Sequence, residues 1–188
     1  GLFKANEAQK SGRTLYNQAV TQARLPVFYA ELDVPDTIDG RFEAIVLHVW
    51  LILRRLRRET SAPAPAKSDG RQKISQAMFD AMITDMDRSL REMGVGDLRV
   101  GKRVKAMARS FYGHVHAYDE GFDGGDMAAA LRRNVYGAAD TADSGFDRVV
   151  QALARYVERA ASSLENQPFE DIIGGNIKFV RPLGGESR

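Results

Sequence analysis

The segment from Gly40 to Glu59 reads GRFEAIVLHVWLILRRLRRE and contains the longest apolar run of the chain, Ala44–Leu53. Apolar residues recur in it at helical spacing, and others fill the remaining faces, so the helix is apolar almost all round. Such a helix belongs in the centre of a bundle. The run is ten residues long, whereas a membrane-spanning helix needs about 20. The segment therefore predicts a buried core helix. Its main stripe is Phe42, Ile45, Val46, Val49, Trp50, Leu53 and Leu56.

Outward from this segment, glycine and proline separate further stretches of helical periodicity, and alternating strand patterns are nearly absent. The chain is long enough to bury a core without disulfides or metal. We predict an all-α fold, a single-domain bundle of about six helices over residues 13–165, with loosely ordered termini at 1–12 and 168–188. Around the central helix, the predicted helical segments are Leu15–Ala23, a short turn within Leu25–Leu32, Lys73–Met93, Val104–Tyr118, Met127–Val135 and Phe146–Leu164.

One low-complexity segment interrupts the pattern. Ser61–Gly70 reads SAPAPAKSDG, a composition typical of flexible or partly extended linkers. Neither side of it looks self-sufficient, so we expect a Pro/Ala-rich loop inside one domain and no domain boundary there.

Composition excludes several classes of protein. There is no cysteine, which excludes disulfides, thiolate nucleophiles and cysteine-ligated metals and fits a reducing compartment. The start of the chain has no apolar signal core, so we expect a soluble, cytoplasmic protein. The net charge of +2 and pI of about 8.9 are too mild to imply nucleic-acid binding, and no DNA partner is expected.

Several blocks of sequence carry a family resemblance. The stretch Phe79–Phe122 contains Asp85–Asp97, DMDRSLREMGVGD, between two amphipathic helical patterns. Upstream, Val34–Glu43 reads VPDTIDGRFE and is followed by LHVW at 47–50 and LRRL at 53–56. Together with Leu15–Tyr29, these blocks resemble the ubiquinol–cytochrome c chaperone family over roughly residues 13–160, in the order that the family has them.

The resemblance implies a function. It implies a non-enzymatic chaperone that binds newly made cytochrome b at the cytoplasmic or matrix face of the membrane and supports assembly of the bc1 complex. It implies no catalytic residue and no cofactor. Mitochondrial relatives work with a small partner protein and associate with ribosomes, and peripheral contact with the inner face of the membrane fits the same role.

Aspartates raise a first alternative, a metal-dependent all-α prenyl-transferring enzyme, because such enzymes hold magnesium and diphosphate between aspartate-rich helices. The spacing argues against a metal site. Asp80 and Asp87 share a helix face but Asp85 points elsewhere, and both Asp85 and Asp87 suit local pairs with arginine on the same helix. The aspartates in question are Asp80, Asp85, Asp87, Asp119 and Asp123.

Histidines raise a second alternative, a haem-carrying or haem-sensing protein. His48 lies in the most apolar helix, where a lone histidine is more often a hydrogen-bonded core residue than a ligand. His114 and His116 are two positions apart, so on one helix they diverge and cannot share a metal. We therefore expect no haem and no metal.

Charged residues give the candidate partner-binding surface. One set crowds the end of the central helix, a second forms a stripe together with His116, and a third lies where the family resemblance is densest. Two interpretations of these charges stay open. They could cap helices and form solvated faces, or they could contact anionic headgroups, ribosomal RNA or acidic segments of a client. The candidates are Arg54, Arg55, Arg57 and Arg58; Lys102, Lys105 and Arg109; and Asp85, Asp87 and Arg88.

Overall fold

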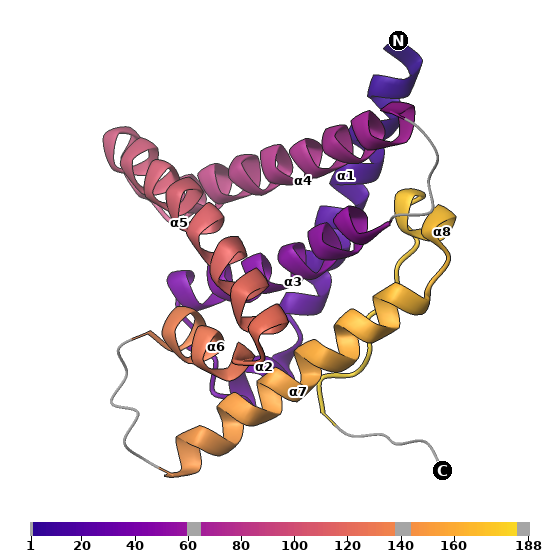
Figure 1. The fold of residues 1–188 in the computed structure, drawn as a ribbon. Coiled ribbons are helices and arrows are strands. Elements are labelled where there is room, and N and C mark those ends of the chain that lie inside the picture. Colours follow the sequence, from indigo (N-terminus) through magenta and orange to yellow (C-terminus); the bar gives the residue numbers. More distant parts are fainter. Residues whose placement is uncertain (1, 60–64, 138–143, 184–188) are drawn as a thin grey trace.

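The structure is a computed structural model that describes residues 2–59, 65–137 and 144–183 (Figure 1). Over these ranges the chain forms helices and no strand, which confirms the all-α prediction. Six helices are substantial and two are single short turns, in agreement with the expected number. The helices are α1 (Leu2–Ala23), α2 (Pro26–Ala30), α3 (Ile38–Arg58), α4 (Pro65–Glu92), α5 (Asp97–Gly124), α6 (Met127–Val135), α7 (Ser144–Asn166) and α8 (Phe169–Ile173).

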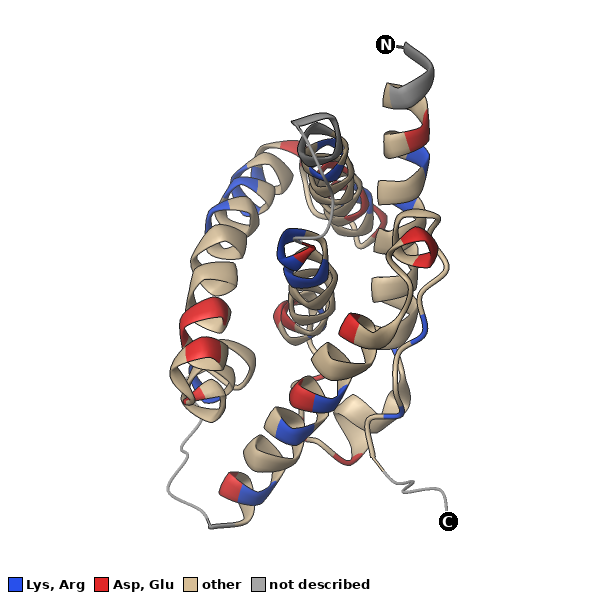
Figure 2. Cartoon of the chain, turned by 45° about the vertical axis from the view of Figure 1, so that its right-hand side comes forward, with Lys and Arg blue, Asp and Glu red and all other residues tan. Residues whose placement is uncertain are grey.

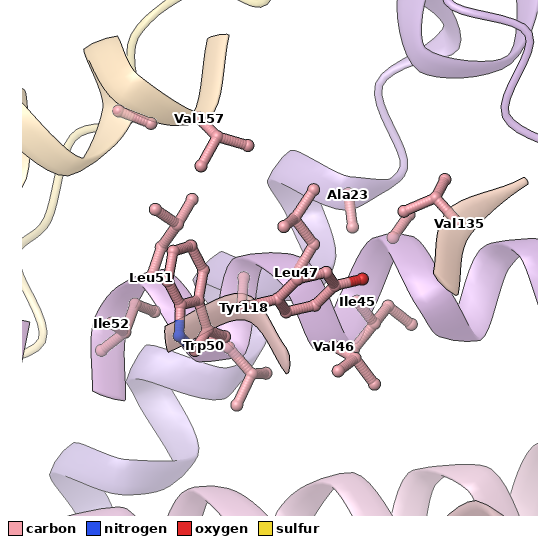
Figure 3. Packing of buried hydrophobic residues seen from close by; sticks show 14 of the residues in the cluster. Ala23, Ile45, Val46, Leu47, Trp50, Leu51, Ile52, Tyr118, Val135 and Val157 are labelled. Atoms are coloured by element: carbon pink, nitrogen blue, oxygen red, sulfur yellow. The ribbon is translucent and has the colours of Figure 1, made fainter. Parts of the chain in front are cut away.

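Helix α3 is the centre of the bundle, as its sequence predicts. It contacts α1, α4, α5, α6 and α7. The helix begins where the Thr37 hydroxyl accepts a hydrogen bond from the Gly40 amide at 3.0 Å, which satisfies one of the free amides of the first turn. Trp50 is fully buried, and Figure 3 shows it among Leu51, Tyr118 of α5 and Val157 of α7. No face of this part of α3 is left for water.

The N-terminal part of the fold is more ordered than expected. Residues 2–12, predicted to be loose, belong to α1, which packs along α4. The close approach depends on Gly12, because a Cβ there would lie 2.5 Å from the Ala77 Cβ. Helix α4 starts at Pro65, a residue whose fixed φ suits a first helical turn. Of the expected loop Ser61–Gly70, residues 65–70 are therefore helical, and residues 61–64 lie outside the described ranges.

The C-terminal segment also differs from the expected loose tail. Ile172 and Ile177 are buried. The Gln167 side chain donates to the Lys178 carbonyl and accepts from its amide, both at 2.8 Å. This two-way hydrogen bond and the two apolar anchors hold residues 168–183 against the bundle. Residues 184–188 lie outside the described ranges. No described helix combines the length and hydrophobicity that a membrane crossing needs.

Candidate partner-binding surface

Arg54 does not belong to an exposed cluster. It is 7% exposed, donates to Asp123 of α5 at 2.9 Å, and places its guanidinium 4.2 Å from the centre of the Phe122 ring. An arginine in this position stabilises the α3–α5 contact. We therefore remove Arg54 from the candidate surface.

Arg55 is also a structural residue. It is 8% exposed and donates to the Leu164 carbonyl at 2.9 Å and the Gln167 carbonyl at 3.3 Å. A third hydrogen bond reaches Glu59 at 3.0 Å. Its donors satisfy carbonyls at the end of α7, which have no partner within that helix. Burial removes Arg55 from the candidate surface as well.

The last two arginines of α3 remain at the surface. Arg57 donates to Asp119 of α5 at 2.7 Å, and Arg58 lies 3.1 Å from Glu165 of α7. About half of each side chain is exposed (49% and 53%). Exposed ion pairs of this kind contribute little to stability, so both arginines stay available to a partner.

Helix α5 carries the second candidate set, which is exposed as predicted. Lys102, Lys105 and Arg109 lie on the surface, and no described residue forms an ion pair or hydrogen bond with them. At alternating intervals of four and three residues, they continue a row that runs from Leu98 to Tyr112. Such intervals keep side chains on one helix face. We call Leu98, Lys102, Lys105, Arg109 and Tyr112 the α5 stripe.

The third candidate set, Asp85, Asp87 and Arg88, contains both largely buried and exposed residues. The Asp85 side chain is only 12% exposed and accepts a 2.6 Å hydrogen bond from the Tyr16 hydroxyl of α1. Burial, followed by this hydrogen bond, raises the pKa of Tyr16, so the tyrosine is a neutral donor. Asp85 therefore joins α4 to α1 and is not a surface candidate. Asp87 pairs with Arg91, whereas Arg88 is 67% exposed and remains a candidate.

A groove with a volume of about 730 Å³ lies between α3, α4 and α5. Phe79 of α4 lies 5.3 Å from the rings of both Phe111 and Tyr112, and Leu53 and Leu56 of α3 also line the groove. Polar residues complete the lining of the groove: Arg57, Arg71, Gln72, Lys73, Ser75 and Gln76. We call this the aromatic groove. Helical periodicity does not mark Phe79 as a groove residue, since the inward stripe of α4 runs through its neighbour, the buried Met78.

A second cleft, of about 1100 Å³, is lined by residues of α1 and α4. Arg13, Lys73 and Arg88 line it together with Asp80 and Asp85, so charges of both signs face each other. Helical spacing predicts Met78, Met82, Met86 and Met93 as core residues. The first three are buried as predicted, whereas Met93, just beyond the end of α4, is 51% exposed, so the prediction for Met93 is wrong.

The aspartates do not form a metal site in the described part of the chain. Asp119 accepts hydrogen bonds from the Trp50 indole at 2.8 Å and from Arg57, and Asp123 pairs with Arg54. Among the described residues, no three histidine, aspartate or glutamate side chains are placed to share an ion. The acidic residues of α5 are instead partners of the basic end of α3, which argues against the prenyl-transferring alternative.

His48 has the core role expected for it. The ring is fully buried, and its Nδ1 lies 2.7 Å from the Ala44 carbonyl, an acceptor only, so Nδ1 carries the hydrogen. Nε2 then accepts from the Tyr156 hydroxyl at 2.8 Å. Burial lowers the pKa of His48 to about 4, so the ring is neutral at pH 7. Both nitrogens are occupied, which leaves neither for haem iron.

The other two histidines point to different acidic residues. His114 Nδ1 lies 2.7 Å from Glu43 of α3, and burial raises the pKa of that carboxyl while the histidine opposes the shift. His116 is exposed beside Glu120. As the spacing predicted, the two rings serve separate contacts.

In the described residues, the fold is an all-α bundle with two surface clefts and a row of cations on α5 that have no ion-pair partner. The family model of the ubiquinol–cytochrome C chaperone matches residues 30–179. The chain belongs to this family, which confirms the resemblance found in the sequence.

Named relatives agree with this membership. The chain is similar to ubiquinol–cytochrome c reductase complex assembly factor 1 of Mus musculus, with 27% identity over 90% of this chain and 54% of that protein. The Xenopus laevis protein of the same name is 25% identical, over 90% and 80% of the two chains. Protein CBP3, mitochondrial, of Saccharomyces cerevisiae is 30% identical, over 82% and 44%. The chain thus spans about half the length of the mouse and yeast proteins.

A solved structure has the same fold. The crystal structure of the Cbp3 homolog from Brucella abortus matches with a TM-score of 0.74 and 34% identity, over 95% of this chain and 93% of that one. The similarity covers nearly all of both chains, so the arrangement around α3 is shared.

Proposed function

We propose that this protein is an assembly chaperone for ubiquinol–cytochrome c reductase and that its client is newly made cytochrome b. Membership of the chaperone family and the names of the relatives support the assembly role. The observation that supports client binding is the aromatic groove, which lies next to the unpaired cations of the α5 stripe. In this proposal the protein acts on the side of the membrane where cytochrome b is made.

The groove has the chemistry that such a client needs. A membrane protein exposes apolar segments until they are inserted, and aromatic side chains offer large contact areas at low cost in conformational entropy. Tyr112 is 60% exposed although it packs against Phe79, so its ring is partly uncovered. Arg57 in the groove lining and Arg109 one turn before Tyr112 can contact polar or acidic flanks of the same segment.

The test compares two charge insertions on α5. Tyr112→Glu places a carboxylate in the groove wall, whereas Ala106→Glu places one on an exposed position of the same helix outside the α5 stripe. We expect Tyr112→Glu to weaken cytochrome b binding about 30-fold or more, as for a central interface residue, and Ala106→Glu to bind like wild type. Binding is measured by co-purification of cytochrome b from solubilised membranes, with circular dichroism as the folding control.

A second variant tests the charges. Lys105→Glu/Arg109→Glu should also reduce co-purification, because acidic or polar flanks of the client would meet reversed charges. If a folded Tyr112→Glu variant recovered as much cytochrome b as wild type, the proposal that the groove binds the client would be contradicted. The same samples report on a ribosome and a small partner protein, the further partners that the resemblance implies for mitochondrial relatives.

A further inference from the structure

The hairpin between α4 and α5 ends in a projecting tip (Figure 1). Every residue from Arg91 to Arg99 is exposed except Val95, which is half-buried. The tip has a defined backbone: Gly94 has φ of +81°, the Val95 amide bonds the Leu90 carbonyl at 3.1 Å, and the Gly94 amide bonds the Arg91 carbonyl at 2.9 Å. This pair of hydrogen bonds is a Schellman motif, so the tip is a fixed feature of the fold.

Two large apolar side chains are presented at this tip. Leu98 is 91% exposed and Met93 is 51% exposed. Together with Tyr112, they are the large hydrophobic residues that stand out as exposed in the described part of the chain. A single exposed apolar residue is ordinary. Here two lie within five residues of each other at the most projecting point of the hairpin, which gives them access to a surface that the rest of the molecule does not reach.

The charges of α5 are unevenly distributed along the helix. After Asp97 in its first turn, the first half is basic and the second half acidic, as the helix on the left of Figure 2 shows. The helix dipole acts only on the end turns, so it does not account for the cations in the middle of α5. Partners on α3 account for the acidic half, because Asp119 and Asp123 bind Arg57 and Arg54. Of the basic half, only Arg103 has such a partner among the described residues, which is Asp39 of α3.

The basic half is largely unpaired. Arg103 lies 3.0 Å from Asp39, but no described residue forms an ion pair or hydrogen bond with the other cations there. The acidic residues at and near the tip have partners of their own. Asp87 and Asp97 bind Arg91, and Glu92 lies 3.9 Å from Arg88. The cations left over are Arg99, Lys102, Lys105 and Arg109.

We infer that the α4–α5 tip docks on the surface of an anionic lipid bilayer. Leu98 and Met93 enter the boundary between headgroups and acyl chains, while Arg99, Lys102 and Lys105, the unpaired cations nearest the tip, bind the lipid phosphates. A convex tip fits a flat surface, whereas an acidic peptide would need a groove. RNA phosphates could pair with the cations, but RNA binding would not explain why a leucine and a methionine are exposed beside them.

The position of the tip is compatible with the proposed client site. Leu98 and Tyr112 are 14 positions apart on α5, which separates them by about 21 Å along the helix. The aromatic groove can therefore stay open while the tip is on the membrane. The inference does not depend on the identity of the client.

The experiment is flotation of the full chain with vesicles, in the absence of any client. One set of vesicles is phosphatidylcholine and the other contains equal parts of phosphatidylcholine and phosphatidylglycerol. We expect binding only to the anionic vesicles, and weaker binding as salt is raised. Lys102→Glu/Lys105→Glu should lower the partition coefficient about 30-fold or more, because each cation near the surface contributes about fivefold.

The apolar contribution is tested with a matched pair of variants. Leu98→Glu and Ala106→Glu add the same charge to exposed positions of the same helix, but Leu98→Glu also removes the inserting side chain. Leu98→Glu should bind vesicles at least tenfold more weakly than Ala106→Glu. Circular dichroism should show wild-type helicity for both, since each site is exposed.

Two results would overturn the inference. One is that the wild-type protein does not bind anionic vesicles. This result would overturn the inference even if the same cations bound a single-stranded RNA probe. The other is equal vesicle binding by Leu98→Glu and Ala106→Glu, which would place any lipid contact elsewhere. Tyr112→Glu should bind vesicles like Ala106→Glu, so failure of the lipid test and failure of the client test can be told apart.

Discussion

At the scale of single residues, Arg55 joins the ends of three helices. Its guanidinium bonds two backbone carbonyls at the end of α7 and the Glu59 carboxylate that follows α3. It also lies over the Phe169 ring of α8 at 5.1 Å. Removing such a side chain leaves buried acceptors without donors, and that loss costs far more than the net contribution of the hydrogen bonds.

We therefore predict opposite outcomes for two neighbouring arginines. Arg55→Ala should lower the free energy of unfolding by about 3 kcal/mol, because it breaks a buried charged network. Arg58→Ala should change it by less than about 0.5 kcal/mol, because its ion pair with Glu165 is exposed. Urea denaturation of both variants provides the comparison. Similar midpoints for the two variants would mean that Arg55 is not a structural residue.

His48 makes stability depend on pH. Burial lowers its pKa from 6.5 to about 4 in the folded state, so between these values the unfolded chain binds a proton that the folded chain does not. Stability contributed by the neutral ring is complete above pH 6.5 and is lost as the pH falls towards 4. The loss amounts to about 3 kcal/mol.

This effect can be separated from other titrating groups with His48→Gln. Glutamine is uncharged throughout and can both donate and accept hydrogen bonds. We expect the variant to be less stable at pH 7 but to lose about 3 kcal/mol less than wild type between pH 6.5 and 4. Thermal or urea unfolding at several pH values gives both curves. Parallel curves would show that His48 does not titrate in this way.

At the scale of helices, two glycines with different surroundings test the α1–α4 contact. A Cβ at Gly12 would meet the Ala77 Cβ at 2.5 Å and the Ile74 carbonyl oxygen at 2.7 Å, whereas a Cβ at Gly113 in α5 meets nothing within 4 Å. Alanine is a better helix former than glycine at both positions, so intrinsic propensity favours both substitutions equally.

We predict that Gly12→Ala destabilises the protein by about 1–3 kcal/mol, because overpacking forces α1 and α4 apart. Gly113→Ala should stabilise it by up to about 1 kcal/mol. The measurement is the midpoint of chemical denaturation for each variant. If Gly12→Ala were as stable as Gly113→Ala, α1 would not pack along α4 as closely as the structure has it.

At the scale of the whole molecule, the aspartates and the buried histidine that could bind a metal or haem already have partners within the described part of the protein. Asp119, Asp123 and Asp85 each have an arginine partner, and His48 has two hydrogen-bond partners. We therefore predict that the purified protein holds no stoichiometric metal and no haem. Elemental analysis and a visible spectrum after dialysis test this. Bound metal at a molar equivalent, or a Soret band that survives dialysis, would contradict the prediction and revive one of the two alternatives.

Much of this organisation could be predicted from local sequence patterns. The apolar faces of Gly40–Glu59 determined that α3 is central, because a helix without a polar face has nowhere else to lie. The methionines of α4 recur at helical spacing and are buried. Lys102, Lys105 and Arg109 share one face of α5 and are exposed. In each case the evidence lies within one helix, so the sequence by itself was sufficient.

The tertiary structure alone decided which charges are structural. Arg54 pairs with a residue 69 positions away, and Arg55 bonds a carbonyl 109 positions away. Asp85 binds Tyr16 at a separation of 69 positions. Periodicity within a helix says which way a side chain points, but whether a charge is buried depends on what the crossing helix places opposite it. For the same reason, the aromatic groove existed only once α3, α4 and α5 were brought together.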